Sequence, residues 1–245
     1  SCGINQTSAS MNICVIPARS GSKRLPGKNI KNFDGKPMIV HAINGAKKSK
    51  IFDHIIVSTD DEEIAAIARK WGAKTPFLRP KRLADDYTPT APVISHAVTE
   101  CLALGWSIDY VCCIYPCVPL IQAKDIKLAL DLLQNHASAA YSFPITEFPS
   151  VIQRALRLNS LGHTLPFYTD FELTRTQDLE KAFYDAGLFY WGKPEAWLNN
   201  DKIHSCGAGL EIPNWRVVDV DTLGDWKRAE LMYNVLKENG GLECK

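Results

Sequence analysis

Short apolar runs and amphipathic segments alternate along most of the chain. Runs rich in β-branched and aromatic residues predict strands over residues 12–17, 54–59, 110–115, 139–143, 188–191 and 215–220. Helical spacing predicts helices over residues 62–71, 123–135 and 223–237. Because the strands are apolar on both faces and alternate with helices, they favour a mostly parallel sheet covered by helices. The predicted fold class is α/β, a Rossmann-like three-layer sandwich.

The pattern changes between residues 144 and 184. This segment is richer in polar residues, is interrupted by prolines and shows only weak periodicity. We expect it to be an insertion within a domain that spans residues 11–240. Periodicity leaves open whether it forms a subdomain, a dimer arm or a substrate lid.

Composition is that of an ordinary globular domain. Of 245 residues, 46% are hydrophobic and 22% are charged, and the formal net charge is +1. That balance gives no argument for binding nucleic acid or an acidic membrane surface. No run approaches the roughly 18 apolar residues that a membrane span needs. Residues 19–36, however, contain six basic side chains and a single acid, Asp34, so this segment is a candidate for binding an anion.

The cysteines and the first ten residues bear on the cellular compartment of the protein. None of the eight cysteines forms a C-x₂-C pair, and Cys14, Cys112 and Cys113 lie in apolar strand runs, where buried free thiols are expected. A reducing cytoplasm is the simplest interpretation. Residues 1–10 lack the basic start and apolar centre of a signal peptide. We expect them to be a disordered leader, with Met11 as the native start.

A basic loop rich in small residues follows the first predicted strand. Ligands of parallel α/β sheets collect at the carboxyl ends of strands, and small residues let backbone N–H groups approach an anion. The loop is therefore a candidate triphosphate site; the alternative is a solvated basic loop. It lacks both the Walker A pattern and the G-x-G-x-x-G fingerprint. Its cations and small residues are Arg19, Lys23, Arg24, Lys28, Ser20, Gly21 and Ser22.

Two acids form a second candidate site. Asp219 and Asp221 lie two residues apart at the end of the last predicted strand, so alternation places both on one face. Carboxylate oxygens suit Mg²⁺, which there would offset charge on a triphosphate. The alternative is an exposed strand end that caps the final helix. Asp60 and Asp61 also end a strand, and we expect their main role to be capping the next helix.

With these residues in view, a family resemblance emerges. Residues 16–29, IPARSGSKRLPGKN, resemble the signature I-P-A-R-G-G-S-K-R-x-P-x-K-N of the sialic-acid-type cytidylyltransferases, the CMP-N-acylneuraminate synthetase family. The likeness covers almost everything from Met11 to Leu236. Further motifs follow in the family's order: IVSTD at 56–60, LRP at 78–80, LADD at 83–86 and DVDT at 219–222. The pseudaminic acid branch is indicated by IQRALR at 152–157, TRTQDLE at 174–180 and YDAGLFYWG at 184–192.

The resemblance implies a nucleotidyltransferase domain in which segment 144–184 is a dimerisation and sugar-binding arm. It implies transfer of CMP from CTP to the anomeric hydroxyl of a nine-carbon α-keto acid sugar, with pseudaminic acid favoured and pyrophosphate released. Mg²⁺ is the implied cofactor. A cytoplasmic homodimer that serves flagellin or surface polysaccharide glycosylation is implied as well.

The resemblance also assigns roles to individual residues. Arg19, Lys28 and Asp221 are the implied catalytic residues, and Asp219 with Asp221 would hold the metal. The group that takes the hydroxyl proton stays open between a carboxylate and a metal-linked water. The implied CTP-binding residues are Ala18, Arg19, Ser20, Gly21, Ser22, Lys23, Lys28, Asn29, Arg79 and Thr90. The implied sugar pocket, completed in the family across the subunit boundary, contains Tyr115, Gln153, Arg154 and Asp185.

Two residues depart from the family pattern. Ser20 adds a Cβ where backbone approaches phosphate, which the loop tolerates if the φ angle of Ser20 is negative. Cys117 stands where relatives carry Thr or Ser, so we expect a changed polar contact to the sugar.

Other functions compete with this one. The sugar can instead be N-acetylneuraminate, legionaminate or 3-deoxy-manno-octulosonate. A retaining glycosyltransferase also combines an α/β nucleotide fold with D-x-D, but its acids usually lie mid-chain and the basic loop is missing. A nucleotide-binding module that has lost catalysis is the non-enzyme alternative, and the intact Arg19, Lys28, Asp219 and Asp221 speak against it.

Overall fold

A twisted central sheet organises the molecule. The computed structural model describes residues 11–240, so the leader expected over residues 1–10 lies outside the described residues. The sheet has seven strands in the order β11-β6-β10-β5-β1-β4, with β9 paired to β6. Their bounds are β1 Asn12–Pro17, β4 His54–Ser58, β5 Tyr110–Ile114, β6 Tyr141–Glu147, β9 Phe183–Asp185, β10 Phe189–Gly192 and β11 Gly207–Glu211.

Strand directions confirm the mostly parallel sheet. β1 runs parallel to both β4 and β5, and β11 runs parallel to β6. β10 is antiparallel to β5 and β6, and β9 is antiparallel to β6. The carboxyl ends of β1, β4 and β5 therefore meet at one edge of the sheet, where Pro17 lies opposite Ser58.

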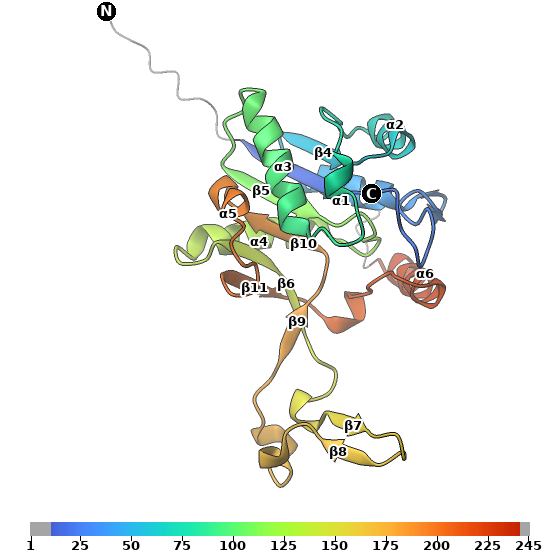
Figure 1. Ribbon diagram of the computed structural model, residues 1–245, viewed down its shortest axis with the longest axis vertical. Coiled ribbons are helices and arrows are strands. Elements are labelled where there is room, and N and C mark those ends of the chain that lie inside the picture. Colours follow the sequence, from blue (N-terminus) through green and yellow to red (C-terminus); the bar gives the residue numbers. More distant parts are fainter. Residues whose placement is uncertain (1–10, 241–245) are drawn as a thin grey trace, which may run out of the picture.

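Helices cover both faces of the sheet, which confirms the three-layer class (Figure 1). Alternation along β1 sends Cys14 and Ile16 to one face and Ile13 and Val15 to the other, and all four are fully buried. The first face packs against α1 Met38–Ser49, α2 Glu62–Lys70 and α4 Ala123–Asn135. The second face packs against α3 Thr90–Ala103 and α5 Pro194–Leu198.

The last helix, α6 Leu223–Glu238, has a separate apolar cluster beside the sheet. Thr222 and Asp225 form a capping box that starts it. Phe33 contacts Trp226 and Tyr233 edge to face, with ring centroids 5.5 and 5.3 Å apart. These contacts hold α6 against the short hairpin of β2 Asn32–Phe33 and β3 Lys36–Pro37, directly after the basic loop.

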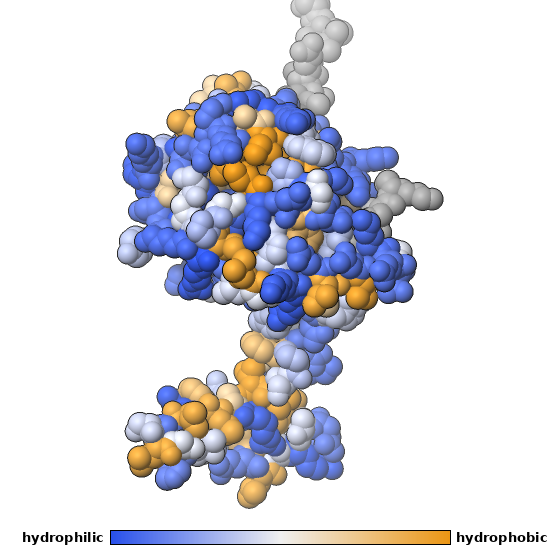
Figure 2. Space-filling view, turned by 90° about the vertical axis from the view of Figure 1, so that its right-hand side faces the viewer, coloured by the Kyte–Doolittle hydropathy of each residue, from blue (hydrophilic) through white to orange (hydrophobic). Residues whose placement is uncertain are grey.

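Between β6 and β9 the chain leaves the sheet as an arm, which we define as residues 148–182 (Figure 1). It carries a two-stranded ribbon, β7 Leu156–Leu158 with β8 Thr164–Pro166. Apolar side chains gather on its surface (Figure 2). Leu158, Leu161 and Leu173 are 73%, 78% and 100% exposed. The short 3₁₀ turns are Ile152–Arg154, Thr169–Phe171 and Thr176–Asp178 in the arm, with Lys81–Leu83 and Asn214–Arg216 elsewhere.

Several sequence expectations are confirmed and one is wrong. The helix expected at 123–135 has those bounds, and Cys14, Cys112 and Cys113 are buried free thiols whose pKa burial raises. The strand expected at 215–220 is wrong, because a 3₁₀ turn followed by an unpaired extended segment replaces it. Its side chains still alternate, with Val218 and Val220 buried in the α6 cluster. Within residues 11–240, no helix is long and apolar enough to cross a membrane.

A buried histidine makes the attachment of α6 sensitive to acid. His41 Nε2 donates to the Phe33 carbonyl oxygen at 2.8 Å, and its ring contacts Phe33 and Tyr233. Burial lowers the pKa of the His41 imidazole. The neutral ring is therefore the form that folding favours, and its contribution to stability is present above the unfolded pKa and lost as pH falls toward the folded pKa.

We predict that the free energy of unfolding of the wild type falls as pH drops below about 6.5. In His41→Gln, a neutral amide can still donate to Phe33 but cannot gain a proton, so the decline is shallower. Urea unfolding across this pH range measures both proteins, and the other histidines act equally in each. Identical declines in the two proteins would contradict the assignment to His41.

Candidate active site

The basic loop lies at the sheet edge where β1 and β4 end. Ala18 N donates to Ser58 O at 2.9 Å, which ties the start of the loop to the neighbouring strand. Buried Asn29 closes the loop by donating from Nδ2 to Arg19 O at 3.0 Å. Gly27 turns the chain with a φ of +67°, a conformation that side-chain-bearing residues rarely adopt. Leu25 is buried in the α6 cluster and anchors the middle of the loop.

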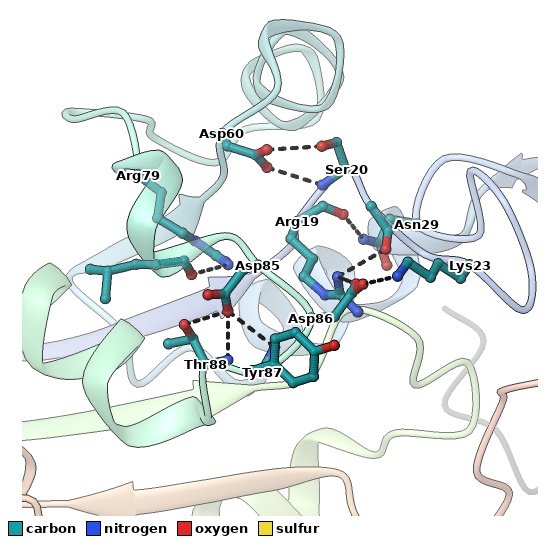
Figure 3. A network of polar contacts seen from close by, with 12 residues as sticks. Arg19, Ser20, Lys23, Asn29, Asp60, Arg79, Asp85, Asp86, Tyr87 and Thr88 are labelled. Atoms are coloured by element: carbon teal, nitrogen blue, oxygen red, sulfur yellow. Dashed lines mark hydrogen bonds and ion pairs between the residues drawn. The ribbon is translucent and has the colours of Figure 1, made fainter.

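Two acids from other segments hold the loop in place (Figure 3). Asp86 forms ion pairs of 2.5 Å with both Arg19 Nη1 and Lys23 Nζ. Hydrogen bonds from Lys23 and Arg19 lower the pKa of Asp86. Asp60 accepts from Ser20 N at 3.0 Å and from Ser20 Oγ at 2.8 Å. Asp86 thus occupies two cationic groups, and Asp60 an N–H and a hydroxyl donor, that an anionic ligand would use.

A tight turn presents Asp86 to the loop. Asp85 Oδ1 accepts from Tyr87 N at 3.0 Å, from Thr88 N at 2.7 Å and from Thr88 Oγ1 at 2.6 Å. These bonds lower the pKa of Asp85, the hydrogen bond from the Thr88 side chain most of all. Asp85 therefore shapes the turn, and Asp86 projects from it toward Arg19 and Lys23.

Asp219 and Asp221, the candidate metal ligands, lie beside the same loop. Lys28 Nζ is 3.4 Å from Asp221 Oδ1 and donates to Val220 O at 3.3 Å. Arg24 approaches the other oxygen of Asp221 at 3.8 Å. Partial desolvation, together with the neighbouring Asp221 charge, raises the pKa of Asp219. The structure thus brings together both halves of the site that the sequence placed about 190 residues apart.

A pocket of about 210 Å³ opens between the basic loop and the start of α3. Buried Arg79 is fixed in its wall by donation from Nη2 to Ser58 O at 2.8 Å and from Nε to Ser58 Oγ at 3.1 Å. Burial lowers the pKa of Arg79 to about 10, which leaves it charged at neutral pH. The lining includes Arg19, Ser22, Lys28, Asn29, Arg79, Thr88, Thr90 and Tyr115.

Two tyrosines lie between this pocket and the base of the arm. Thr90 Oγ1 and Tyr115 Oη are 3.1 Å apart, and the ring of Tyr115 contacts that of Tyr190, with centroids 5.3 Å apart. Tyr190 Oη in turn donates to Asp185 Oδ2 at 2.7 Å. Tyr115 and Asp185, two of the expected sugar-binding residues, are therefore connected to the pocket.

The other two expected sugar-binding residues lie in the arm. Gln153 Nε2 donates to Glu180 O at 3.3 Å. Arg154 donates from Nη1 to Phe171 O at 2.5 Å and from Nη2 to Thr174 O. Both side chains bond to the arm's own backbone, and neither lines the pocket between the loop and α3. Their role toward sugar stays a prediction.

Both departures from the family pattern have a structural counterpart. Among the described residues that carry a side chain, only Asp34, Lys50 and Asn200 have positive φ angles, so the Cβ of Ser20 is tolerated. The thiol of Cys117 lies 3.3 Å from Asn29 Oδ1. Burial raises the pKa of Cys117 to about 12, so this group stays a neutral thiol.

Sequence reasoning missed some residues of the site and misjudged another. Asp61 caps α2 as expected, accepting from Glu63 N at 2.7 Å, whereas Asp60 binds Ser20 of the loop. In the sequence Asp86 stands out only within the LADD motif at 83–86, and Tyr190 only within the motif at 184–192. The consecutive acids Asp85 and Asp86 were the available signal for a counter-charge to the basic loop.

Comparison with known proteins identifies the family. The sequence model of the family described as Cytidylyltransferase matches residues 13–186. The chain belongs to the cytidylyltransferase family. Pseudaminic acid cytidylyltransferase of Campylobacter jejuni is 41% identical over 93% of this chain and 98% of its own length. CMP-N,N′-diacetyllegionaminic acid synthase of Legionella pneumophila is 35% identical over 92% of this chain and 97% of its own.

A solved structure shares the fold of this cytidylyltransferase. CMP:2-keto-3-deoxy-manno-octonic acid synthetase in complex with CTP superposes with a TM-score of 0.70 over 92% of this chain and 99% of that one, at 17% identity. The chain is accordingly a nucleotidyltransferase by family, and its mixed α/β architecture is that of related enzymes.

We predict that Asp86→Asn binds CTP about three- to tenfold more tightly than the wild type, because a neutral amide no longer competes with a triphosphate for Arg19 and Lys23. Titration calorimetry measures the dissociation constants. Asp131→Asn, on the exposed side of α4, makes the same change in net charge far from the loop and is the control. An unchanged or weaker affinity in Asp86→Asn would show that Asp86 does not oppose nucleotide binding.

Proposed function

We propose that this cytidylyltransferase transfers CMP from CTP to the anomeric hydroxyl of pseudaminic acid and releases pyrophosphate. The observation that carries the proposal is the pocket beside the basic loop in a chain that is 41% identical, over 93% of its length, to a protein named pseudaminic acid cytidylyltransferase. The reaction needs the sugar hydroxyl in line with the α-phosphorus and needs the charge on the departing pyrophosphate neutralised. Cationic groups placed around the triphosphate can meet both needs, and no covalent enzyme intermediate is required.

In this proposal the basic loop receives the triphosphate. Arg19 and Lys28 contact its oxygens, with the backbone of residues 18–23 around it, and both cations neutralise charge as pyrophosphate leaves. Asn29, Arg79 and Thr90 surround the nucleoside. The rigid bonds of Arg79 to Ser58 support this assignment, because a fixed guanidinium costs no ordering when the ligand binds.

Asp219 and Asp221 are the residues that would hold Mg²⁺. Their carboxylates suit a hard divalent cation, and they lie beside Lys28 at the triphosphate loop. Over residues 11–240 no group of three or more His, Cys, Asp or Glu side chains forms a metal site, so nucleotide oxygens and water would complete the coordination. When bound, Mg²⁺ supplies charge neutralisation on the phosphate oxygens.

We further propose that the arm makes a homodimer and carries sugar-binding groups to the partner's pocket. Its exposed leucines form a surface that a second copy would bury. Gln153 and Arg154 lie in the arm, away from the pocket of their own chain, which fits a site completed across the subunit boundary.

The setting of the reaction is also part of the proposal. A cytoplasmic location agrees with the free thiols of the described cysteines. A role in flagellin or surface glycosylation is supported by a relative from Campylobacter coli named post-translational flagellin modification protein B, 30% identical over 90% of this chain. N,N′-diacetyllegionaminic acid is the second candidate sugar, on account of the Legionella relative.

Pyrophosphate release with CTP, Mg²⁺ and a panel of nine-carbon α-keto acid sugars tests the activity. We expect turnover with CTP and fastest turnover with pseudaminic acid. Faster turnover with the legionaminic or N-acetylneuraminic sugar would make that sugar the assigned substrate in place of pseudaminic acid. Turnover with UTP or a hexose phosphate but not with CTP would reject the proposal.

Asp221→Asn tests the metal assignment. We expect kcat to fall about a hundredfold or more, with loss of the dependence of rate on Mg²⁺ concentration, because a neutral amide binds the cation poorly. Asp131→Asn is again the control and should keep both the wild-type kcat and the dependence of rate on Mg²⁺ concentration. A variant rate close to that of the wild type would remove Asp221 from the metal site.

The double substitution Leu158→Glu and Leu173→Glu tests the arm interface. We expect light scattering to give the mass of a dimer for the wild type and of a monomer for the variant, because charges at the buried centre of an interface oppose association. Leu231→Glu, at an exposed leucine of α6, is the matched control and should stay dimeric. A dimeric double variant would place the interface elsewhere.

A further inference from the structure

The segment that carries Asp219 and Asp221 has no partner strand. Residues 217–221 are extended, but they lie outside the strands of the central sheet. In a sheet, the pairing with a neighbour helps to set the register of a strand, and a slip by one residue turns every side chain to the opposite face. No such pairing fixes residues 217–221, so their register depends on which side chains face inward.

Side chains along this segment alternate between the interior and the surface. Val218 and Val220 are buried in the α6 cluster. Arg216 has the same parity and is buried as well, although it carries a charge. Asp219 and Asp221 have the opposite parity and lie on the outer face, beside the basic loop. The inward placement of Arg216 therefore goes together with the outward placement of both acids.

A buried ion pair holds Arg216 in its inward position. Arg216 Nη1 lies 2.6 Å from Asp125 Oδ2, and the two side chains are only 8% and 6% exposed. Asp125 lies in the first turn of α4, where the helix dipole favours a carboxylate. Trp191 of β10 donates from Nε1 to Ile126 O at 2.9 Å and ties this turn of α4 to the sheet. Asp125 is thus a fixed point to which Arg216 is bound.

A shifted register would break this pair. After a slip by one residue, the position of Arg216 would be taken by Trp215 or Val217. Neither residue can pair with Asp125, and a buried charge without its partner is strongly destabilising. An apolar contact at the same place would discriminate far less, because the hydrophobic effect has no direction and both neighbours are apolar.

The other end of the segment is fixed by separate contacts. Asp221 N and Thr222 N donate to Asp225 Oδ2 at 3.1 and 2.9 Å, where α6 begins. These bonds hold the backbone at the last acid, whereas the ion pair acts on the first turn of the segment, five residues earlier.

We propose that Asp125 and Arg216 are positioning residues whose ion pair fixes the register of residues 215–221 and thereby places Asp219 and Asp221 beside the basic loop. Charge and direction give this pair the selectivity that the apolar contacts of the segment lack. The consequence for the metal rests on the proposed function, in which the two acids would hold Mg²⁺.

The double variant Asp125→Leu with Arg216→Met tests the pair without leaving a lone charge. Replacing a buried ion pair by apolar residues is often neutral or stabilising, whereas either single substitution would leave a buried charge without its partner. We therefore expect the double variant to fold and to melt cooperatively. The matched control makes the same kinds of substitution in an exposed ion pair of α2, Glu62→Leu with Arg69→Met.

Thiol labelling measures the register without any ligand. Val218→Cys introduces a thiol at an inward-facing position, where a small apolar side chain is tolerated. Iodoacetamide should label this position slowly in the otherwise wild-type protein and in the control, and about tenfold faster or more in the double variant, as read by peptide mass. Equally slow labelling in the folded double variant would overturn the proposal.

The affinity for CTP with and without Mg²⁺ measures the consequence for the two acids. By titration calorimetry we expect Mg²⁺ to strengthen CTP binding about tenfold in the wild type and the control, but less than about threefold in the double variant. In EDTA the double variant should bind CTP at least as well as the wild type, because the basic loop is intact.

Two results of the calorimetry would overturn the proposal. One is a full effect of Mg²⁺ in the double variant despite fast labelling, and the other is an equal loss of CTP affinity with Mg²⁺ and with EDTA, which would indicate general damage to the site. If Mg²⁺ had no effect in the wild type, the proposed metal site would fail instead, and the labelling rate would still decide whether the ion pair fixes the register.

Discussion

Electrostatic balance around the loop after β1 is the constraint on which the site depends. Arg19, Lys23 and Lys28 are brought into one small region, and like charges at such distances repel one another unless counter-charges are near. Asp86 balances the first two and Asp221 the third. Each carboxylate comes from a segment far away in the sequence, so these counter-charges reach the loop only in the folded chain.

The architecture delivers those counter-charges through separate pieces of core. The parallel arrangement of β1 and β4 puts Asp60 next to Ser20. Val220 and Leu25 of the loop are both buried in the cluster around α6. Their shared packing brings Asp221 to Lys28. Packing of apolar residues thus sets the spacing of the charges. In the proposed function, a triphosphate that enters the loop would exchange one set of negative charges for another.

Much of this could be predicted from the sequence where a local pattern carries the information. Runs such as residues 12–17 and 123–135 have a clear period, and their elements lie where expected. The extended segment at 215–220 has the alternation of a strand without a partner, because its buried face packs on α6 and not on a sheet neighbour. Pairings such as Asp86 with Arg19, or Thr90 with Tyr115, join residues distant in sequence, and no local period reveals them.

Hydrogen exchange of the backbone amides in residues 20–28 tests most directly whether this loop receives the triphosphate. Addition of CTP should slow exchange throughout the loop, because phosphate oxygens take up its N–H groups and cations. CMP lacks the β- and γ-phosphates and should slow exchange there far less. Equal slowing by CTP and CMP, or slowing by CTP only outside the loop, would contradict the account.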